Sequence, residues 1–227
     1  KRCVISINSP GSNIDHTGFC RMCRNEPPLD ETEKSRHEMR LNMEALFKKV
    51  KKNRCGDYDA IVALSGGKDS TYTLKMLVRD YGLDCLAVTV ENGFLSEKAV
   101  ENCYRVTEQL ETDFILFKPS TTFMRRMYRA SVEGELHPPG AIRRASDICN
   151  SCINLINTRM VKIAISYNVS LIAGGYLGGQ VPKNTAVMSL DLQQQKAIQI
   201  SASKRVIDKL GSEAERMFNL PELDLDN

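Results

Sequence analysis

Residues 58–70 read Tyr58-Asp59-Ala60-Ile61-Val62-Ala63-Leu64-Ser65-Gly66-Gly67-Lys68-Asp69-Ser70. An apolar run, typical of a buried strand, passes directly into two glycines and a short polar segment. Beyond it, apolar side chains repeat at the spacing of one helix face, and Gly82 ends that helix. The repeating positions are Leu74, Leu77, Val78 and Tyr81. The predicted order is therefore buried strand, glycine turn and helix.

This turn has the composition of a phosphate-binding loop. Adjacent glycines let an anion approach the backbone N–H groups, and the following helix N-terminus adds its positive dipole end. Ser65 and Ser70 can donate to phosphate oxygens, Lys68 can neutralise charge, and Asp69 can hold a magnesium ion. The four-residue spacing of a Walker A loop is absent, which disfavours a GTPase or motor protein.

The segment Ser65-Gly66-Gly67-Lys68-Asp69-Ser70 resembles the PP-loop of the N-type ATP pyrophosphatases, or adenine nucleotide α-hydrolases, and the resemblance runs from about Asp57 to Gly179. It implies an enzyme that binds ATP and Mg²⁺, transfers AMP onto an acceptor oxygen and releases pyrophosphate. A sulfur or nitrogen nucleophile then expels AMP. The implied ATP-binding residues are Ser65, Gly66, Gly67, Lys68, Asp69, Ser70, Val90, Glu91, Gly174 and Gly175, with Lys68 and Asp69 also catalytic.

Further strands are predicted at Cys85–Val90, Asp113–Lys118 and Val169–Gly174, each separated from the next by helical patterns. This alternation predicts an α/β fold with a Rossmann-like parallel sheet of the PP-loop type, and ligands at the carboxyl ends of its strands. A helix is expected from Ala202 to Phe218. Residues 119–147 are expected to be irregular and basic, either holding an anionic acceptor over the strand ends or lying solvated without contacts.

A small cysteine module precedes this core. Cys20 and Cys23 form a Cys-x-x-Cys pair, and Cys3 lies before them with sixteen residues between it and Cys20, which suits a structural zinc site. The segment resembles the N-terminal zinc ribbon of N-acetyl sugar amidotransferases, which are PP-loop enzymes. The resemblance places a fourth cysteine immediately before Lys1, and His16 is the alternative fourth ligand.

A second cysteine pair, Cys149 and Cys152, opens a predicted helix with both sulfurs on one face. A helix N-terminus favours the thiolate form, and two thiolates there can ligate an iron–sulfur cluster, carry a persulfide or bind zinc. The pair resembles that of the sulfur-inserting PP-loop enzymes of tRNA. A cluster would need Cys85 or Cys103 as a third ligand, or one of its irons would have no cysteine ligand. The apolar patterns around Cys85 and Cys103 predict that both side chains face the core.

Composition fits this assignment. The chain has 227 residues, 31 Lys and Arg against 28 Asp and Glu, and a formal charge of +3, too weak to indicate nucleic acid by itself. There is no apolar run of membrane-span length and no visible signal peptide. Eight cysteines beside a nucleotide-binding core favour a cytoplasmic protein with reduced thiols.

The expected organisation is a cysteine module at 1–29, a linker helix at 30–56, the PP-loop domain at 57–200, and a C-terminal helix at 201–227 that looks truncated.

Three functions stay open. The preferred one is ATP-dependent sulfur transfer, with Cys149 and Cys152 catalytic, to a tRNA or nucleotide-sugar acceptor from a separate sulfur donor. An N-acetyl sugar amidotransferase fed with ammonia by a glutaminase partner is the second, and a nucleotide-binding module without turnover is the third. The expected cofactors are ATP, Mg²⁺ and Zn²⁺, with an iron–sulfur cluster as an option, and a homodimer is an option for the assembly.

Overall fold

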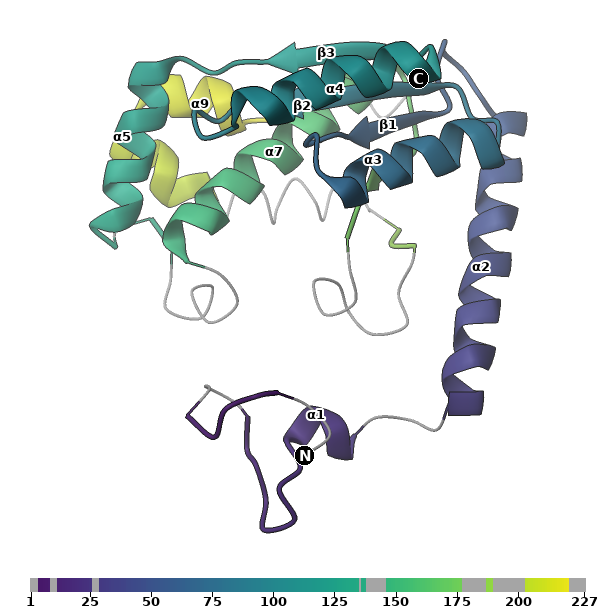
Figure 1. The fold of residues 1–227 in the computed structure, drawn as a ribbon. Coiled ribbons are helices and arrows are strands. Elements are labelled where there is room, and N and C mark those ends of the chain that lie inside the picture. Colours follow the sequence, from purple (N-terminus) through teal and green to yellow (C-terminus); the bar gives the residue numbers. More distant parts are fainter. Residues whose placement is uncertain are drawn as a thin grey trace. The chain divides into compact units, whose positions relative to one another are not determined.

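In the computed structural model, the described residues are 4–8, 12–25, 29–134, 136–137, 146–176, 187–189 and 203–220. Four strands form one parallel sheet in the order β3-β2-β1-β4 (Figure 1). Their bounds are β1 Ala60–Ala63, β2 Cys85–Val90, β3 Asp113–Phe117 and β4 Ile172–Gly174. The predicted α/β class with a Rossmann-like parallel sheet is therefore confirmed.

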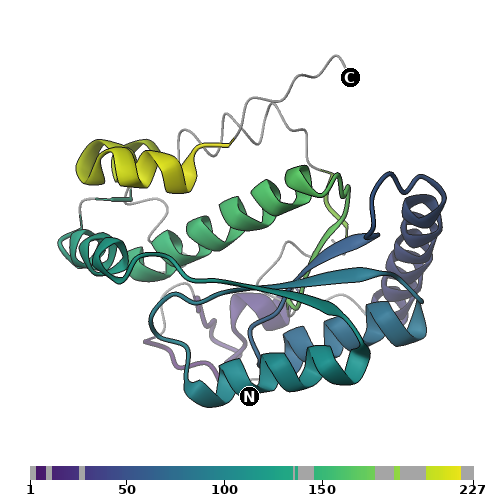
Figure 2. The same ribbon diagram turned by 90° about the horizontal axis from the view of Figure 1, so that it is seen from above.

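Helices cover both faces of this sheet (Figure 2). On one face, Ile61, Leu86 and Val88 pack against α7, Asp147–Ser166. On the other lie α3, Lys68–Lys75, and α4, Glu97–Leu110, where the Thr89 hydroxyl donates to the Cys103 sulfur over 3.5 Å. Every residue of β2 is buried, which explains the unbroken apolar run at this position in the sequence.

The helices begin and end at local signals. The Ser96 hydroxyl accepts the Ala99 N–H at the start of α4, and the Ser146 hydroxyl accepts the Cys149 N–H at the start of α7. Helix α3 continues into a π-helical turn, η1, at Met76–Asp80. Gly82 follows with φ +61°, a conformation that favours glycine, so the helix ends where the sequence predicts.

The prediction that residues 119–147 are irregular was wrong for their first half. Helix α5 spans Thr121–Val132, and its buried Phe123, Met124 and Met127 belong to the core formed with α7 and α9. The Ser120 hydroxyl caps it. The basic residues that suggested a loop lie on the exposed side of an amphipathic helix, so their charge concealed the apolar stripe. Residues 138–145 of this prediction lie outside the described residues.

The C-terminal helix is two helices rather than one. Residues 203–210 are helical, Gly211 has φ +77°, and α9 follows at Ser212–Phe218. The turn at Gly211 lets both segments turn apolar side chains into the core beside α5 and α7, which a single straight helix would not do. These side chains are Val206, Leu210, Ala214, Met217 and Phe218. Position 202 and positions 221–227 of the predicted region are outside the described part.

The chain divides into two compact units, Lys1–Glu44 with Asn184–Val187, and Ala45–Lys183 with Met188–Asn227. The first contains the short helix α1, Arg21–Arg24, and most of α2, Leu29–Lys52, at the place of the predicted linker helix. The last turns of α2 belong to the second unit, where the Phe47 ring meets the Tyr81 ring edge-on at 4.8 Å. None of the helices that the structure describes is long and apolar enough to span a bilayer.

Candidate active site

The loop between β1 and α3 is organised by one hydroxyl. The Ser65 N–H donates to Ser70 Oγ over 3.1 Å, and the two serine hydroxyl oxygens lie 3.0 Å apart. Ser70 Oγ also donates to the Gly67 carbonyl over 3.2 Å. Ser70 is buried, so these contacts hold the loop in one shape before any ligand arrives.

The first glycine of the loop is needed for that shape. Gly66 has φ +72°, and a Cβ there would lie 2.1 Å from the Ala99 carbonyl oxygen at the start of α4. Gly67 is the N-cap of α3, and no side chain caps that helix. The first backbone amides of α3 are therefore available to an anion, as the sequence predicts for a phosphate-binding loop.

The end of β4 lies against this loop. Ala63 of β1 pairs with Gly174 of β4, and a Cβ added to Gly175 would lie 2.7 Å from both the Asp69 carbonyl carbon and the Ser70 nitrogen. A larger residue at this position would press on the backbone of the α3 start. The structure thus brings together the two glycine-containing segments that were predicted to bind ATP.

Lys68 and Asp69 form an exposed ion pair with 2.7 Å between Nζ and Oδ1. Both side chains can turn toward a ligand at the loop, because the Lys68 side chain is 82% exposed and that of Asp69 38%. Within the described residues no group of three His, Cys, Asp or Glu side chains is arranged for a metal. One carboxylate completed by phosphate oxygens and water is nevertheless a normal environment for Mg²⁺, so Asp69 fits the predicted magnesium ligand.

The segment after β2 is fixed by an ion pair. The Glu91 N–H donates to the Phe117 carbonyl over 2.8 Å, and its carboxylate pairs with Lys118 Nζ at 2.7 Å. The Lys118 ammonium, assisted by the Gly93 N–H, holds the pKa of Glu91 below its usual value. Since this carboxylate is occupied and Val90 is buried, a nucleotide at the end of β2 would meet backbone atoms rather than these side chains.

Cys152 is held beside this same strand end. Asn92 Nδ2 donates to Cys152 Sγ over 3.1 Å, while Asn92 Oδ1 accepts the Phe94 N–H over 2.9 Å. The Tyr128 hydroxyl donates to the Asn92 carbonyl over 3.4 Å and lies near Cys152; burial, followed by the nearness of this sulfur, raises the pKa of Tyr128. Cys149, one turn earlier on α7, is exposed. The two thiols therefore differ: Cys152 is partly buried and accepts a hydrogen bond from Asn92, whereas Cys149 faces solvent.

Neither cysteine that was expected to complete an iron–sulfur cluster can reach this pair. Cys103 is fully buried and contacts Thr89 on the opposite face of the sheet from α7. Cys85 begins β2, whereas Asn92 follows its other end, a separation of about 20 Å at the usual rise of a strand. Within residues 45–227 all cysteines are described, and none of them supplies a third ligand beside Cys149 and Cys152.

The N-terminal module contains two of the cysteines that were predicted to bind zinc. Cys20 is the N-cap of α1, and its sulfur accepts the Cys23 N–H over 3.4 Å. A thiolate that accepts a backbone N–H two or three residues along suits a metal-binding turn. His16, the alternative ligand, is exposed. Cys3 lies outside the described residues, so a complete ligand set is not described.

Sequence reasoning missed Asn92 and Tyr128. Asn92 carried a usable signal, because it follows a buried parallel strand directly, where ligands gather in such sheets. Tyr128 carried no such signal, because its segment was interpreted as a loop.

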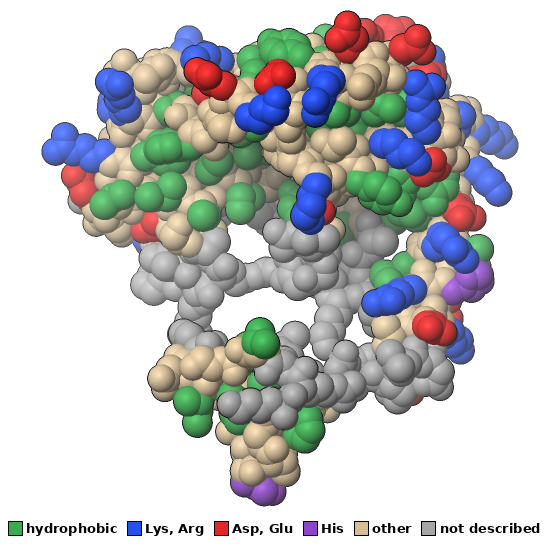
Figure 3. Space-filling view, viewed as in Figure 1, with side chains coloured by type: hydrophobic (Ala, Val, Ile, Leu, Met, Phe, Trp, Pro, Cys, Tyr) green, Lys and Arg blue, Asp and Glu red, His purple; other side chains and the backbone are tan. Residues whose placement is uncertain are grey.

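Figure 3 shows Lys and Arg side chains interspersed with Asp and Glu over the visible face of the described residues, in keeping with the small net charge.

No family model matches the chain. An uncharacterized protein of Methanocaldococcus jannaschii is 29% identical over 139 residues, which are 61% of this chain and 45% of that protein. The chain thus spans about half the length of the curated relative it matches.

Several solved structures are similar at low identity. An NH3-dependent NAD synthetase from Campylobacter jejuni is 15% identical, with 78% of this chain and 76% of that one covered and a TM-score of 0.46. An NMN synthetase from Francisella tularensis is 16% identical, with 84% and 79% covered and a TM-score of 0.46. A U34-tRNA thiolase from Methanococcus maripaludis, solved with its 4Fe–4S cluster, is 14% identical, with 70% and 48% covered and a TM-score of 0.38. Because these TM-scores lie below 0.5, we rest the function on the chain's own residues.

Proposed function

We propose that this chain is a PP-loop ATP pyrophosphatase, which cleaves ATP between the α and β phosphates and transfers AMP onto an oxygen of an acceptor. The observation that carries the proposal is the loop between β1 and α3, closed by Ser70 and backed by Gly175. Its uncapped helix start offers backbone amides, and Lys68 and Asp69 stand beside it.

The chemistry follows from these groups. A carbonyl or amide oxygen leaves poorly, whereas AMP leaves well, so adenylation activates the acceptor for displacement. The loop amides and Lys68 would hold and neutralise the phosphates, and Asp69 would hold Mg²⁺, which supplies further charge neutralisation when bound. Positioning and electrostatics suffice for in-line attack, so no covalent intermediate on the loop is required.

Phosphorus NMR of the products tests this proposal. The chain is incubated with MgATP and either unmodified tRNA or a set of nucleotide sugars, and we expect AMP and pyrophosphate. Asp69→Asn should lower the rate at least tenfold, whereas Asp80→Asn, which removes a carboxylate that pairs with Lys75 near the other end of the same helical segment, should not. ADP and orthophosphate as the products would contradict the proposal.

We further propose sulfur as the preferred nucleophile. Its support is Cys152, which lies beside Asn92 at the end of β2, on the same edge of the sheet as the loop after β1. A thiol that accepts a hydrogen bond at this edge has a place in sulfur transfer, and ammonia transfer gives it no chemical task. The sulfur would come from a separate donor.

Ammonia transfer is the second candidate, and the contact between Cys23 N–H and Cys20 Sγ favours it, because it suits the ribbon of sugar amidotransferases. To distinguish the two candidates, ATP and acceptor are supplied with either sulfide or ammonium, and the product is identified by mass spectrometry. Sulfur transfer predicts a thio product that is lost in Cys152→Ser. An amino product, formed as well by Cys149→Ser/Cys152→Ser as by the unaltered chain, would establish the amidotransferase.

A further inference from the structure

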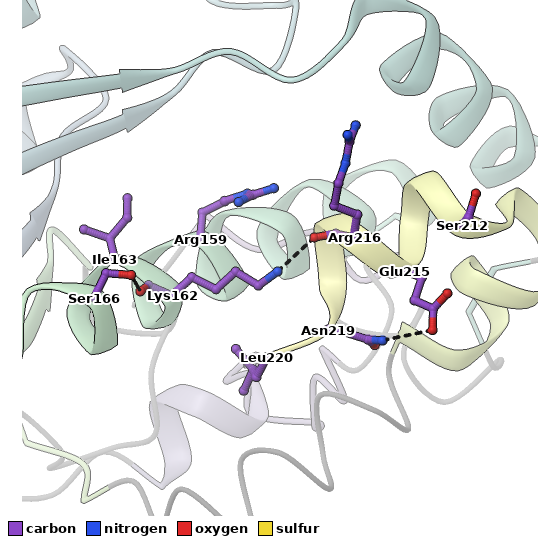
Figure 4. Close-up of a pocket in the computed structure, with 9 residues that line it drawn as sticks. All are labelled: Arg159, Lys162, Ile163, Ser166, Ser212, Glu215, Arg216, Asn219 and Leu220. Carbon is purple, nitrogen blue, oxygen red and sulfur yellow. Dashed lines mark hydrogen bonds between the residues drawn. The ribbon is translucent and has the colours of Figure 1, made fainter. Parts of the chain in front are cut away.

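A groove lies between α7 and α9, apart from the loop that is proposed to bind ATP (Figure 4). Its volume is about 650 Å³, within the range of sites that hold small molecules. It shares no residue with the Ser65–Ser70 loop. The lining residues are Arg159, Lys162, Ile163, Ser166, Ser212, Glu215, Arg216, Asn219 and Leu220.

Three cations dominate the lining. Arg159 and Lys162 come from α7 and Arg216 from α9, and in the described part of the chain none of the three joins an ion pair. Burial lowers the pKa of Arg159, and the nearby Arg216 lowers it further. Burial likewise lowers the pKa of Lys162, with Arg159 adding to the effect. The cluster therefore carries like charges that a bound anion would relieve.

Two of these cations, Arg159 and Lys162, are held in place by neutral partners. The Arg159 guanidinium lies over the Phe117 ring, 4.0 Å from its centroid, and donates to Met217 Sδ over 2.8 Å. Its Nε is buried and has no hydrogen-bond partner among the described residues. Lys162 Nζ donates to the Arg216 carbonyl oxygen over 2.9 Å. These contacts fix the side chains without neutralising them, so little ordering remains to be done when an anion binds.

The other lining groups are suited to hydroxyls rather than to a second anion. Ser166 and Ser212 present hydroxyl groups, and Glu215 accepts the Asn219 amide over 3.4 Å. A carboxylate and an amide side by side are acceptors and donors for sugar hydroxyl groups. Ile163 and Leu220 add an apolar surface beside them.

We propose that this groove binds a phosphorylated sugar, free or as part of a nucleotide, with its phosphate on Arg159, Lys162 and Arg216. The hydroxyl groups of the sugar lie toward Glu215 and Asn219. This proposal does not depend on the chemistry proposed for the PP-loop, because the groove residues lie on other elements.

Calorimetric titration of the full chain with ribose 5-phosphate, AMP, inorganic phosphate and unphosphorylated ribose tests the proposal. AMP can also occupy the proposed ATP site, so only the part of its binding that Arg216→Gln removes reports on the groove. Ribose 5-phosphate should bind saturably. Arg216→Gln and Lys162→Met should each weaken that binding at least about tenfold, as the loss of a charge-assisted contact predicts. Arg216 is exposed, so its variant keeps the test valid if Lys162→Met is unstable.

Two control variants complete the design. Arg125→Gln removes an exposed cation on α5, and Lys68→Ala removes the cation of the PP-loop; both should leave the binding of ribose 5-phosphate unchanged. The proposal is overturned if neither phosphorylated sugar binds, or if both groove variants bind as the unaltered chain does. It is also overturned if Lys68→Ala abolishes the binding, or if inorganic phosphate or unphosphorylated ribose binds as tightly as the phosphorylated sugars.

Discussion

Asn92 Nδ2 donates a hydrogen bond of 3.1 Å to the sulfur of Cys152, sixty residues further along the chain. The contact joins the segment after β2 to the first turns of α7 and singles out Cys152 from its exposed neighbour Cys149. A donor at this distance stabilises a thiolate more than a thiol. The Asn92 side chain is therefore expected to control the reactivity of Cys152.

We predict that Asn92→Leu slows alkylation of Cys152 by about tenfold near pH 8, the effect of losing one hydrogen bond to a charged group. Both proteins should carry Cys149→Ser, so that the peptide containing Cys152 reports on one thiol. The rate is measured with iodoacetamide and peptide mass spectrometry. Exposed Cys55 is the internal control and should react equally in both. Equal rates at Cys152 would show that the amide does not influence this sulfur.

The two central strands, β1 and β2, could be predicted from local sequence because they are buried on both faces. The bounds of β2 agree with the predicted Cys85–Val90, since an apolar run enclosed by helices leaves no polar alternation to misinterpret. Helix α5 was missed for the opposite reason: its arginines lie on the exposed side, and their charge outweighed the buried Phe123 and Met127.

The candidate site, too, could be predicted only where its residues are close together in the sequence. The PP-loop is a contiguous motif, and the residues that shape it are neighbours in the sequence. The contacts of Cys152 with Asn92 and Tyr128 are tertiary, and each partner lies on a different element. No local pattern encodes such a contact, so the sequence identified the cysteines but not the groups that distinguish them.

A structural zinc gives the next prediction. One equivalent of zinc should co-purify with the chain and fall by at least half in Cys20→Ser, because Cys20 accepts the Cys23 N–H in the arrangement of a metal-binding turn. Cys149→Ser is the matched control and should retain zinc. Metal content is measured by inductively coupled plasma mass spectrometry. Zinc that survives Cys20→Ser and disappears in Cys149→Ser would place the metal on α7 instead.

The pair of Glu91 and Lys118 predicts a pH dependence. Its hydrogen bond with Lys118 lowers the pKa of Glu91, so the pair stabilises the fold above the unfolded value of about 4.3, and this contribution is lost as the pH falls through the lower folded value. Lys118→Met should cost less than about 1 kcal/mol at pH 7, since Lys118 is largely exposed.

Urea unfolding measured from pH 7 to pH 3 checks the sign of this effect. The midpoint difference between Lys118→Met and the unaltered chain should shrink toward acid pH. Lys52→Met, which alters an exposed lysine at the end of α2, should show no such trend. A difference that stays constant down to pH 3 would mean that Lys118 acts through packing rather than through Glu91.

The last prediction separates backbone strain from close contact in the PP-loop. Gly66 and Gly93 both have positive φ, +72° and +88°, so alanine at either position costs about 1–2 kcal/mol of backbone strain. Only at Gly66 does the added Cβ meet another atom, the Ala99 carbonyl oxygen at 2.1 Å; at Gly93 nothing lies within 4 Å. Gly66→Ala should therefore lower the free energy of unfolding by at least about 2 kcal/mol more than Gly93→Ala. Urea unfolding of the two variants measures that difference directly, and equal losses would show that α4 can move away from the loop without cost.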